Sequence, residues 1–341
     1  MARMQAARAT PARVVAVSLG ALALAVAAIA GSLAVGVERV DVGRALGDRS
    51  SLDAAILFGA RAPRVALGAL VGAALSVAGV AFQALLRNPL GDPYVLGVSG
   101  GAAVAGTAAA FFGGAGALGL WTRPVWAFGG ALAAVTAVFV FGRVRGQLVP
   151  HVALLAGVVI NALSGALIMA LRALMSPGAQ LEALGWLAGT LGVVDGTRLA
   201  VLAVYALVAL AVLAANAIDL NALALGEEAA RTIGVDVDRA RRVVFFAASL
   251  ATAAAVAFAG PIGFVGIVVP HAVRRLVGAD HRLLVPAALF GGAAFLVVAD
   301  AAARLTFLAI GSEPPVGVLT ALVGAPLFLV ILRRPGGARA L

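Results

Sequence analysis

The sequence predicts an all-α, polytopic membrane protein. Hydrophobic residues make up 63% of the 341 positions and charged residues only 12%, whereas soluble domains are roughly 45–50% apolar. The mean hydropathy is +1.08. The apolar residues fall in runs of about 20, the length that a helix needs to cross a bilayer, and charged residues gather between the runs. We therefore expect one transmembrane domain over residues 1–341.

Ten apolar runs are long enough to be spans. They lie near 14–37, 63–86, 94–112, 124–142, 149–171, 198–217, 243–259, 261–277, 283–308 and 316–332. The first run follows Arg3, Arg8 and Arg13 and so resembles a signal peptide, but its length of about 24 residues suits a retained helix better. Because the number of spans is even, we expect both termini on the same side of the membrane.

The arginines set the expected orientation. The chain has no lysine, and its formal charge of +10 comes from 25 arginines against 15 acidic residues. If both termini are cytoplasmic, sixteen arginines fall on the cytoplasmic side and nine outside, where acids such as Glu38, Asp41 and Asp53 dilute them. This asymmetry is the positive-inside pattern of membrane proteins. The arginines cluster at span ends and form no basic stripe, so the sequence does not indicate nucleic-acid binding.

Several catalytic chemistries lack their residues. Without cysteine there is no thiolate nucleophile, and without lysine there is no G-x-x-x-x-G-K-[ST] loop for ATP. His151, His271 and His281 lie near cytoplasmic span ends without metal-ligand spacing, so we interpret them as interfacial hydrogen-bonding groups and expect no metal site. Within the spans, Asp300 and Arg304 are four residues apart and are expected to pair. The scarcity of other buried charges counts against a proton-driven carrier, and no catalytic constellation supports an intramembrane enzyme.

One polar stretch, Leu220–Arg242, separates apolar segments in the second half of the chain. Apolar residues recur in it at helical spacing and predict a short helix with one apolar face: Leu225, Ala229 and Ile233. Glu227 and Arg231 are placed to pair along the opposite face, and Gly234 is a suitable helix stop. The stretch is either a solvated loop or a docking helix presented to a soluble partner at the cytoplasmic surface.

Glycine and proline interrupt the apolar pattern at 87–93, 260–266 and 313–317. Broken backbone at membrane depth occurs where protein or a water-filled cavity satisfies it, and such breaks often line a pathway. Alternatively, proline only ends a helix at the interface, which fits 87–93 at least as well. A similarity between 78–82 and 259–264 is compatible with an inverted repeat but does not establish one.

Several long motifs, in order over about residues 14–334, resemble those of the FecCD-type permeases of ABC importers. They are RAPR at 61–64, RNPLGDPYVLGVSGG at 87–101, GPIGFVGIVVPH at 260–271, and EPPVGVLTALVGAP at 313–326. The resemblance implies a homodimer with ten helices per subunit around a central translocation pathway. It also implies two copies of a separate ATP-binding-cassette ATPase, which holds ATP and Mg²⁺, and a periplasmic substrate-binding protein. The chain itself would need no cofactor.

The resemblance assigns roles to three sets of residues. In the family, arginines on the outer surface pair with acidic residues of the binding protein. The matching positions in this chain are Arg61, Arg64 and Arg304. The coupling region that docks on the ATPase, at about 218–242, matches chiefly Leu225, Gly226, Glu227, Ala229, Ile233 and Gly234. The pathway and its cytoplasmic gate match Asn88, Leu90, Asn161 and Ser164, with Pro150 and His151 standing where vitamin B12 members carry small hydroxyl residues.

From the sequence we expect the permease subunit of an ATP-driven importer in a bacterial inner membrane, with both termini cytoplasmic. The family imports vitamin B12, haem and ferric siderophores. Ferric-siderophore and haem members are common in the family, and together with the departure at His151 this favours a ferric siderophore or haem over vitamin B12, which stays the alternative. A stand-alone secondary carrier or channel is the rival of a different class.

Overall fold

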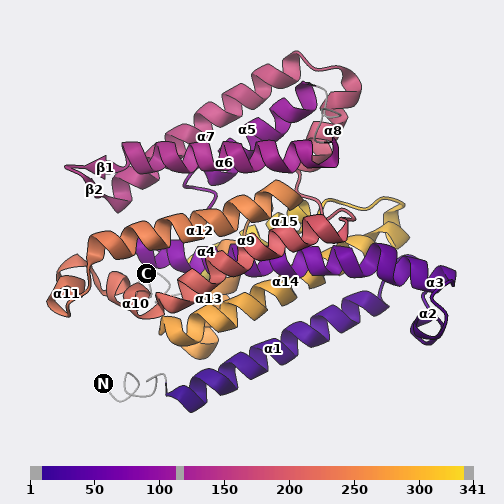
Figure 1. Cartoon of the computed structure of the whole chain (residues 1–341), viewed down its shortest axis with the longest axis horizontal. Helices are drawn as coiled ribbons and strands as arrows, with labels where there is room; N and C mark the ends of the chain where they lie inside the picture. Colours follow the sequence, from indigo (N-terminus) through magenta and orange to yellow (C-terminus); the bar gives the residue numbers. More distant parts are fainter. Residues whose placement is uncertain (1–9, 113–118, 334–341) are drawn as a thin grey trace.

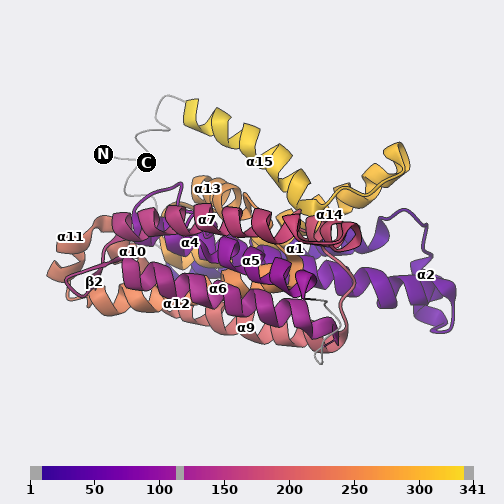
Figure 2. The same ribbon diagram turned by 90° about the horizontal axis from the view of Figure 1, so that it is seen from above.

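The computed structural model describes residues 10–112 and 119–333, with side chains up to 329. Long helices run along the long axis of the molecule, and one of them, α15, stands away from the rest (Figures 1 and 2). They are α1 (Pro11–Ala34), α4 (Ala62–Leu86), α5 (Val98–Phe111), α6 (Thr122–Phe141), α7 (Pro150–Ala173), α9 (Gly196–Ala215), α12 (Val237–Ala259), α13 (Val265–Val277), α14 (His281–Ile310) and α15 (Val316–Arg333). Each of the ten predicted spans falls on one of them. Seven helical stretches within the described residues are long and apolar enough to cross a membrane.

Short elements lie at the two ends of this bundle (Figure 1). One end carries α2 (Val42–Gly47), α3 (Leu52–Ala54) and α8 (Pro177–Leu187), and the opposite end carries α10 (Ala217–Leu225), α11 (Glu227–Thr232), and the two-residue strands β1 (Arg143–Val144) and β2 (Gln147–Leu148). A π-helix (Ala55–Arg61) leads into α4, and a 3-10 turn (Gly119–Trp121) leads into α6. The sequence did not reveal α2, α3 or α8, because a short helix outside the bilayer lacks a long apolar run.

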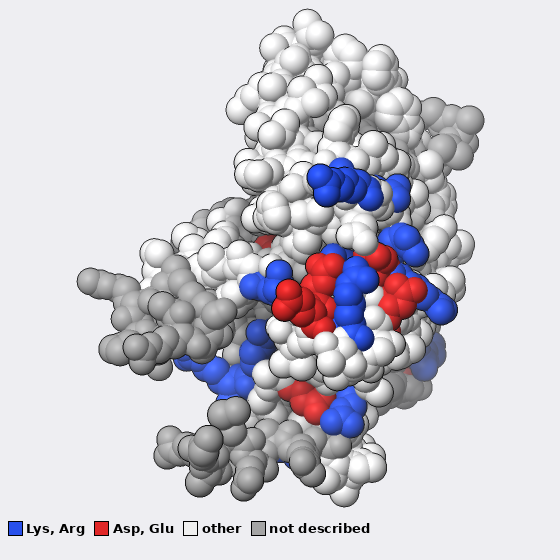
Figure 3. Space-filling model, turned by 90° about the vertical axis from the view of Figure 1, so that its left-hand side faces the viewer, with Lys and Arg blue, Asp and Glu red and all other residues white. Residues whose placement is uncertain are grey.

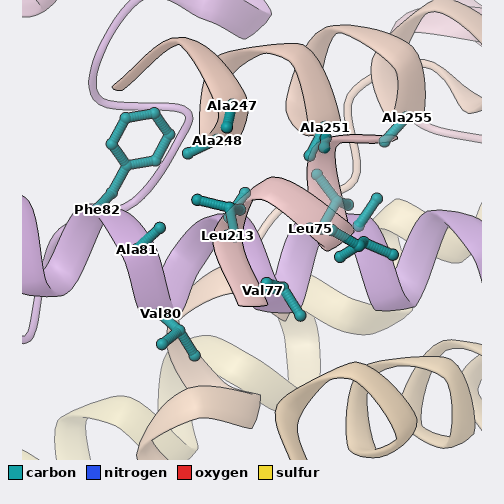
Figure 4. Packing of buried hydrophobic residues seen from close by; sticks show 14 of the residues in the cluster. Leu75, Val77, Val80, Ala81, Phe82, Leu213, Ala247, Ala248, Ala251 and Ala255 are labelled. Carbon is teal, nitrogen blue, oxygen red and sulfur yellow. The ribbon is translucent and has the colours of Figure 1, made fainter. Parts of the chain in front are cut away.

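Helix α4 is the centre of the bundle. Every residue from Val71 to Leu85 is buried, and its apolar side chains meet α9 and α12, where alanines allow a close approach (Figure 4). Glycines bring its backbone against two further helices: a Cβ on Gly72 would lie 2.2 Å from the carbonyl oxygen of Gly292 in α14, and one on Gly79 would lie 2.0 Å from that of Gly266 in α13. Larger residues at these positions would force the helices apart.

Two spans contain short helices because non-helical backbone precedes each helix. Helix α5 has 14 residues and α13 has 13, and each follows one of the breaks expected from glycine and proline. The breaks meet inside the protein, where the backbone N–H of Ile262 donates to Tyr94 Oη at 2.5 Å and Asn161 Nδ2 donates to the carbonyl oxygen of Tyr94 at 2.7 Å. Protein groups thus satisfy non-helical backbone within the bundle.

The two break-containing units run in opposite directions. Helix α4 ends beside α11, since Arg87 approaches Gly226, whereas α12 begins beside α11. The chain then turns back into the bundle after each helix. This opposite polarity agrees with the inverted repeat to which the similarity between 78–82 and 259–264 pointed.

The coupling region differs from the sequence expectation in one respect. A single short helix was expected to carry Leu225, Ala229 and Ile233, but the structure has two: α10 ends at Leu225 and α11 begins at Glu227. Gly226 between them has φ +112°, a conformation that residues with a Cβ rarely adopt. The helical spacing could not reveal this break, because one glycine within an apolar pattern does not by itself end a helix.

Candidate functional site

The polar stretch at the α11 end presents apolar side chains to the outside. Leu225 is 72% exposed and Ile233 is 63% exposed, and Ala229 is exposed between them. We call these three residues the coupling surface. Leu225 ends α10, Ala229 lies within α11 and Ile233 follows directly after α11. Exposed apolar groups beside charged ones are typical of a surface that another protein covers.

Ion pairs hold α11 in place. Glu227 accepts from Arg231 Nη2 at 3.0 Å, which confirms the expected pair, and from Arg241 Nη2 of α12 at 2.9 Å. These hydrogen bonds, from Arg231 first and then Arg241, hold the pKa of Glu227 below its ordinary value. Gly234, with φ +86°, follows the end of α11 as expected. The coupling surface is therefore fixed against α12 by Glu227.

Basic and acidic side chains alternate over this end of the molecule (Figure 3). Helix α1 begins here as well, because Arg13 Nη2 donates to the carbonyl oxygen of Val277 at the end of α13. Of the three histidines, His281 confirms the expected hydrogen bonding: its Nδ1 lies 2.8 Å from Asn221 Oδ1. His271 Nε2 is buried without a partner among the described residues.

At the opposite end, the three predicted docking arginines lie in one cluster. Arg64 makes a two-pronged contact with Asp300, with Nε and Nη2 at 2.9 and 2.7 Å from Oδ1, and also pairs with Glu313. Arg304 Nε lies 3.1 Å from Asp300 Oδ2, which confirms the expected pair within α14. We call these residues, together with Arg61, the outer arginine cluster.

Most of the outer arginine cluster is enclosed. Arg61 and Arg304 are only 7% and 6% exposed. Their guanidinium groups donate to backbone carbonyls where α1 ends, Arg61 to Leu33 and Arg304 to Ser32 and Val35. Arg64 keeps 19% of its side chain exposed. The structure thus gives Arg61 and Arg304 internal partners, and their role in docking a binding protein stays a prediction.

Helix α7 presents an uncovered apolar face. Leu155, Val159 and Leu163 are each about three-fifths exposed, at 63%, 66% and 59%. The predicted polar pathway residues Asn161 and Ser164 do not lie on this face. Both approach Gly100 of α5, where a Cβ would lie 2.5 Å from Asn161 Oδ1 and 2.9 Å from Ser164 Oγ. Whether they line a pathway stays a prediction.

The predicted gate residues lie near the α11 end. Asn88 Oδ1 accepts from the backbone N–H of Leu90 at 2.9 Å, so the amide shapes the turn that follows α4, and Leu90 is 37% exposed. Pro150 opens α7, and His151 beside it is exposed. The structure does not bring Asn88 and His151 into contact, and their gating role stays a prediction.

Over residues 10–112 and 119–333, seven apolar stretches of membrane length, with non-helical breaks inside the bundle, define a polytopic membrane protein. Comparison with known proteins specifies the family: the model of the FecCD transport family matches residues 14–334, and the chain belongs to this family. The chain is therefore a permease subunit of an ABC transporter, and in such transporters the ATPase activity lies in a partner subunit. This membership confirms the resemblance found in the sequence motifs.

Individual relatives cover most of the chain. It is 46% identical to the cobalamin import system permease protein BtuC of Halobacterium salinarum, over 80% of this chain and 72% of the relative. It is 41% identical to the hemin transport system permease protein HmuU of Yersinia pestis, over 85% and 87%, and 36% identical to the ferric enterobactin transport system permease protein FepD of Escherichia coli, over 94% and 96%. A solved ABC transporter of metal-chelate type in an inward-facing conformation matches with a TM-score of 0.82 at 30% identity, over 94% of this chain and all of that one.

Proposed function

We propose that this chain is the membrane-spanning permease of an ATP-driven importer for a bulky metal chelate, a ferric siderophore or haem. The observation that carries the proposal is the coupling surface, an exposed apolar surface held by ion pairs on a connection between spans. Family membership supplies the ATP-driven class, and the relatives named for hemin and ferric enterobactin support the substrate class. A corrinoid is the second candidate, and the 46% identity to a cobalamin permease supports it.

We propose that the coupling surface docks in a groove on a separate ATPase, which holds ATP and Mg²⁺. Short helices with an apolar face and a charged flank suit groove recognition. Leu225 and Ile233 supply the apolar contacts, and Glu227 transmits movement of α11 to α12 through Arg241. Two copies of the ATPase would serve a permease dimer, and closure of the ATPases around ATP would then tilt these short helices and switch the pathway between its two faces.

A second copy of the chain is the proposed partner of the exposed apolar face of α7. Helix α15 stands away from the bundle on the same side as α7 (Figure 2), and its Leu322 is 68% exposed. A translocation pathway between two copies would need such faces, since neither α7 nor α15 encloses a channel by itself. Lipid would cover the remaining exposed helices, above all α1.

The proposed location is a bacterial inner membrane with both termini cytoplasmic. The positive-inside distribution of arginine supports it, and so does the start of α1 beside the end of α13 at the α11 end. The outer arginine cluster would then face the periplasm. There Arg64, the exposed member, is the proposed contact for an acidic residue of a substrate-binding protein.

The test is purification of the tagged chain from its native membrane in mild detergent, with mass spectrometry of the proteins that accompany it. We expect an ATPase with a G-x-x-x-x-G-K-[ST] loop in equal amount, and uptake into liposomes that requires ATP. A co-purified binding protein would then be screened with haem, ferric siderophores and cobalamin. A chain that purifies alone and transports without ATP would instead establish the stand-alone carrier.

A further inference from the structure

A basic cavity of about 220 Å³ opens beside the coupling surface. It lies between the end of α4, the turn that follows it, α10, α13 and the start of α14. Its lining contains two guanidinium groups, one imidazole and two amides: Gln83, Ala84, Arg87, Asn88, Pro89, Ala224, Arg274 and His281. No carboxylate lines the cavity among the described residues.

Two buried nitrogen atoms of this lining have no partner in the part of the chain that the structure describes. They are Arg274 Nε and His281 Nε2, and His281 is only 3% exposed. The other nitrogen of the ring, Nδ1, faces the acceptor Asn221 Oδ1 and therefore carries a hydrogen. A buried polar atom without a hydrogen bond is costly, so these two atoms point to an occupant that supplies their bonds.

The charges of the lining are also uncompensated. Within the described residues, the Arg274 side chain bonds only a neutral group, Gln83 Oε1 at 2.9 Å. The Arg87 guanidinium makes no hydrogen bond or ion pair there, although the Arg87 backbone N–H bonds the end of α4. The adjoining acid, Asp280, is engaged elsewhere, by Arg282 at 2.8 Å and Asn221 at 2.9 Å. The cavity therefore favours a negatively charged occupant.

We propose that the basic cavity receives one acidic side chain of the ATPase, whose carboxylate pairs with Arg87 and Arg274. Arg87 connects the cavity to the proposed interface, because the same side chain also lines the hollow formed by Leu225, Gly226 and Glu227. A protein that covers the coupling surface would thus contact a side chain that also lines the cavity. A carboxylate inside it also favours protonation of His281, whose Nε2 then donates to it. This proposal rests on the proposed docking of an ATPase.

The cavity volume agrees with a single side chain. About 220 Å³ corresponds to roughly seven water molecules at about 30 Å³ each, enough for a carboxylate and part of its chain. The apolar coupling surface would supply affinity, and the carboxylate would fix the register of the ATPase on it, since charge pairs at interfaces contribute mainly to orientation and partner choice.

The test compares two arginine variants of the full-length chain in lipid nanodiscs. The probe is the ATPase that co-purifies with the wild-type chain, and the measurement is its dissociation constant. Arg87→Gln removes a guanidinium group that makes no side-chain hydrogen bond or ion pair within the described residues, so the fold should persist. Arg275→Gln is the matched control, because Arg275 is exposed on α13 and does not line the cavity. We expect about tenfold weaker binding for Arg87→Gln and wild-type binding for Arg275→Gln.

A charge swap identifies the occupant. Arg87→Glu should weaken binding further, and replacement of one Asp or Glu of the ATPase by Arg should restore it. Wild-type ATPase binding by both Arg87→Gln and Arg274→Gln would overturn the proposal while leaving the proposed function intact. Loss of a bound phospholipid or phosphate from Arg87→Gln in native mass spectrometry, with ATPase binding unchanged, would also overturn it. Failure of the wild-type chain to bind any ATPase would instead refute the proposed function.

Discussion

The outer arginine cluster and the basic cavity hold similar residues in opposite states. In the outer cluster Asp300 accepts hydrogen bonds from two arginines, Arg64 and Arg304. Backbone carbonyls at the end of α1 accept hydrogen bonds from the other guanidinium nitrogens. In the basic cavity Arg87 and Arg274 have no acidic partner within the described residues, and apolar side chains stand exposed nearby. Arginines whose charges are paired within the chain stabilise the fold. Arginines without an acidic partner beside an exposed apolar surface are suited to bind another protein.

Removal of the central acid of the outer cluster should have the largest effect. Asp300→Ala leaves Arg64 and Arg304 close together without their shared counter-charge, and Asp300 is only 1% exposed. Breaking a buried pair in this way costs about 3–5 kcal/mol. We expect a loss of that size in the free energy of unfolding, measured by denaturant titration in detergent. Glu182→Ala is the control, because its pair with Arg123 lies at the surface and should be worth about 1 kcal/mol or less.

If Asp300→Ala unfolds at the same denaturant concentration as the wild-type chain, the outer cluster does not join α1, α4 and α14. The arginines would then be free for docking alone, as the sequence motifs suggested.

The coupling surface should show the reverse pattern, with a loss of binding and unchanged stability. Leu225→Ser combined with Ile233→Ser removes exposed apolar area, so the free energy of unfolding should stay within about 0.5 kcal/mol of wild type. Each apolar side chain buried at an interface is worth about 1.5–3 kcal/mol, which predicts at least about tenfold weaker ATPase binding in nanodiscs. Leu276→Ser is the control, because Leu276 is 83% exposed on α13 but lies outside the coupling surface. An equal loss of ATPase binding in Leu276→Ser would mean that the loss does not depend on the coupling surface.

The third prediction separates docking from stability within the outer cluster. Glu313 occupies the exposed side of Arg64, where an acidic residue of a binding protein would have to compete with it. Glu313→Gln should therefore strengthen binding-protein affinity by about twofold to fivefold, because an exposed ion pair is worth little. Surface plasmon resonance of the nanodisc-embedded permease measures the change. Arg64→Gln should weaken binding, and unchanged affinity in both variants would remove Arg64 from the docking surface.

Local signals in the sequence predicted the helices and the pairs within one helix. Apolar runs located all ten spans, and spacing of four residues located the pairs Asp300–Arg304 and Glu227–Arg231. These features need only neighbouring residues, and helix geometry fixes which neighbours meet.

Features assembled from distant segments were not predictable. Arg64 and Asp300 are 236 residues apart, so a pattern read along the chain could not show that one acid serves two arginines. The basic cavity likewise combines Arg87, Arg274 and His281, each of which appeared alone as a polar residue at a span end. The sequence motifs could identify the docking arginines by family resemblance, but only the packing of α1 against α14 reveals how deeply two of them are buried.

The smallest expected effect concerns Glu227, which links the coupling surface to α12. Its pKa lies below the ordinary value because Arg231 and then Arg241 donate to the ionised carboxylate. Since the folded pKa is depressed, the contribution of Glu227 is complete above the unfolded pKa of about 4.3 and is lost as pH falls through the lowered folded value. Hydrogen exchange of the α11 amides, corrected for intrinsic rates, should therefore show constant protection from pH 8 to about 5 and decreasing protection below about 4.3. Glu227→Gln should abolish this decrease and give weaker protection throughout. If protection of the α11 amides in the wild-type chain did not change with pH, packing alone would hold α11. The coupling surface would then lack the ionic connection to α12 on which its proposed role in transport depends.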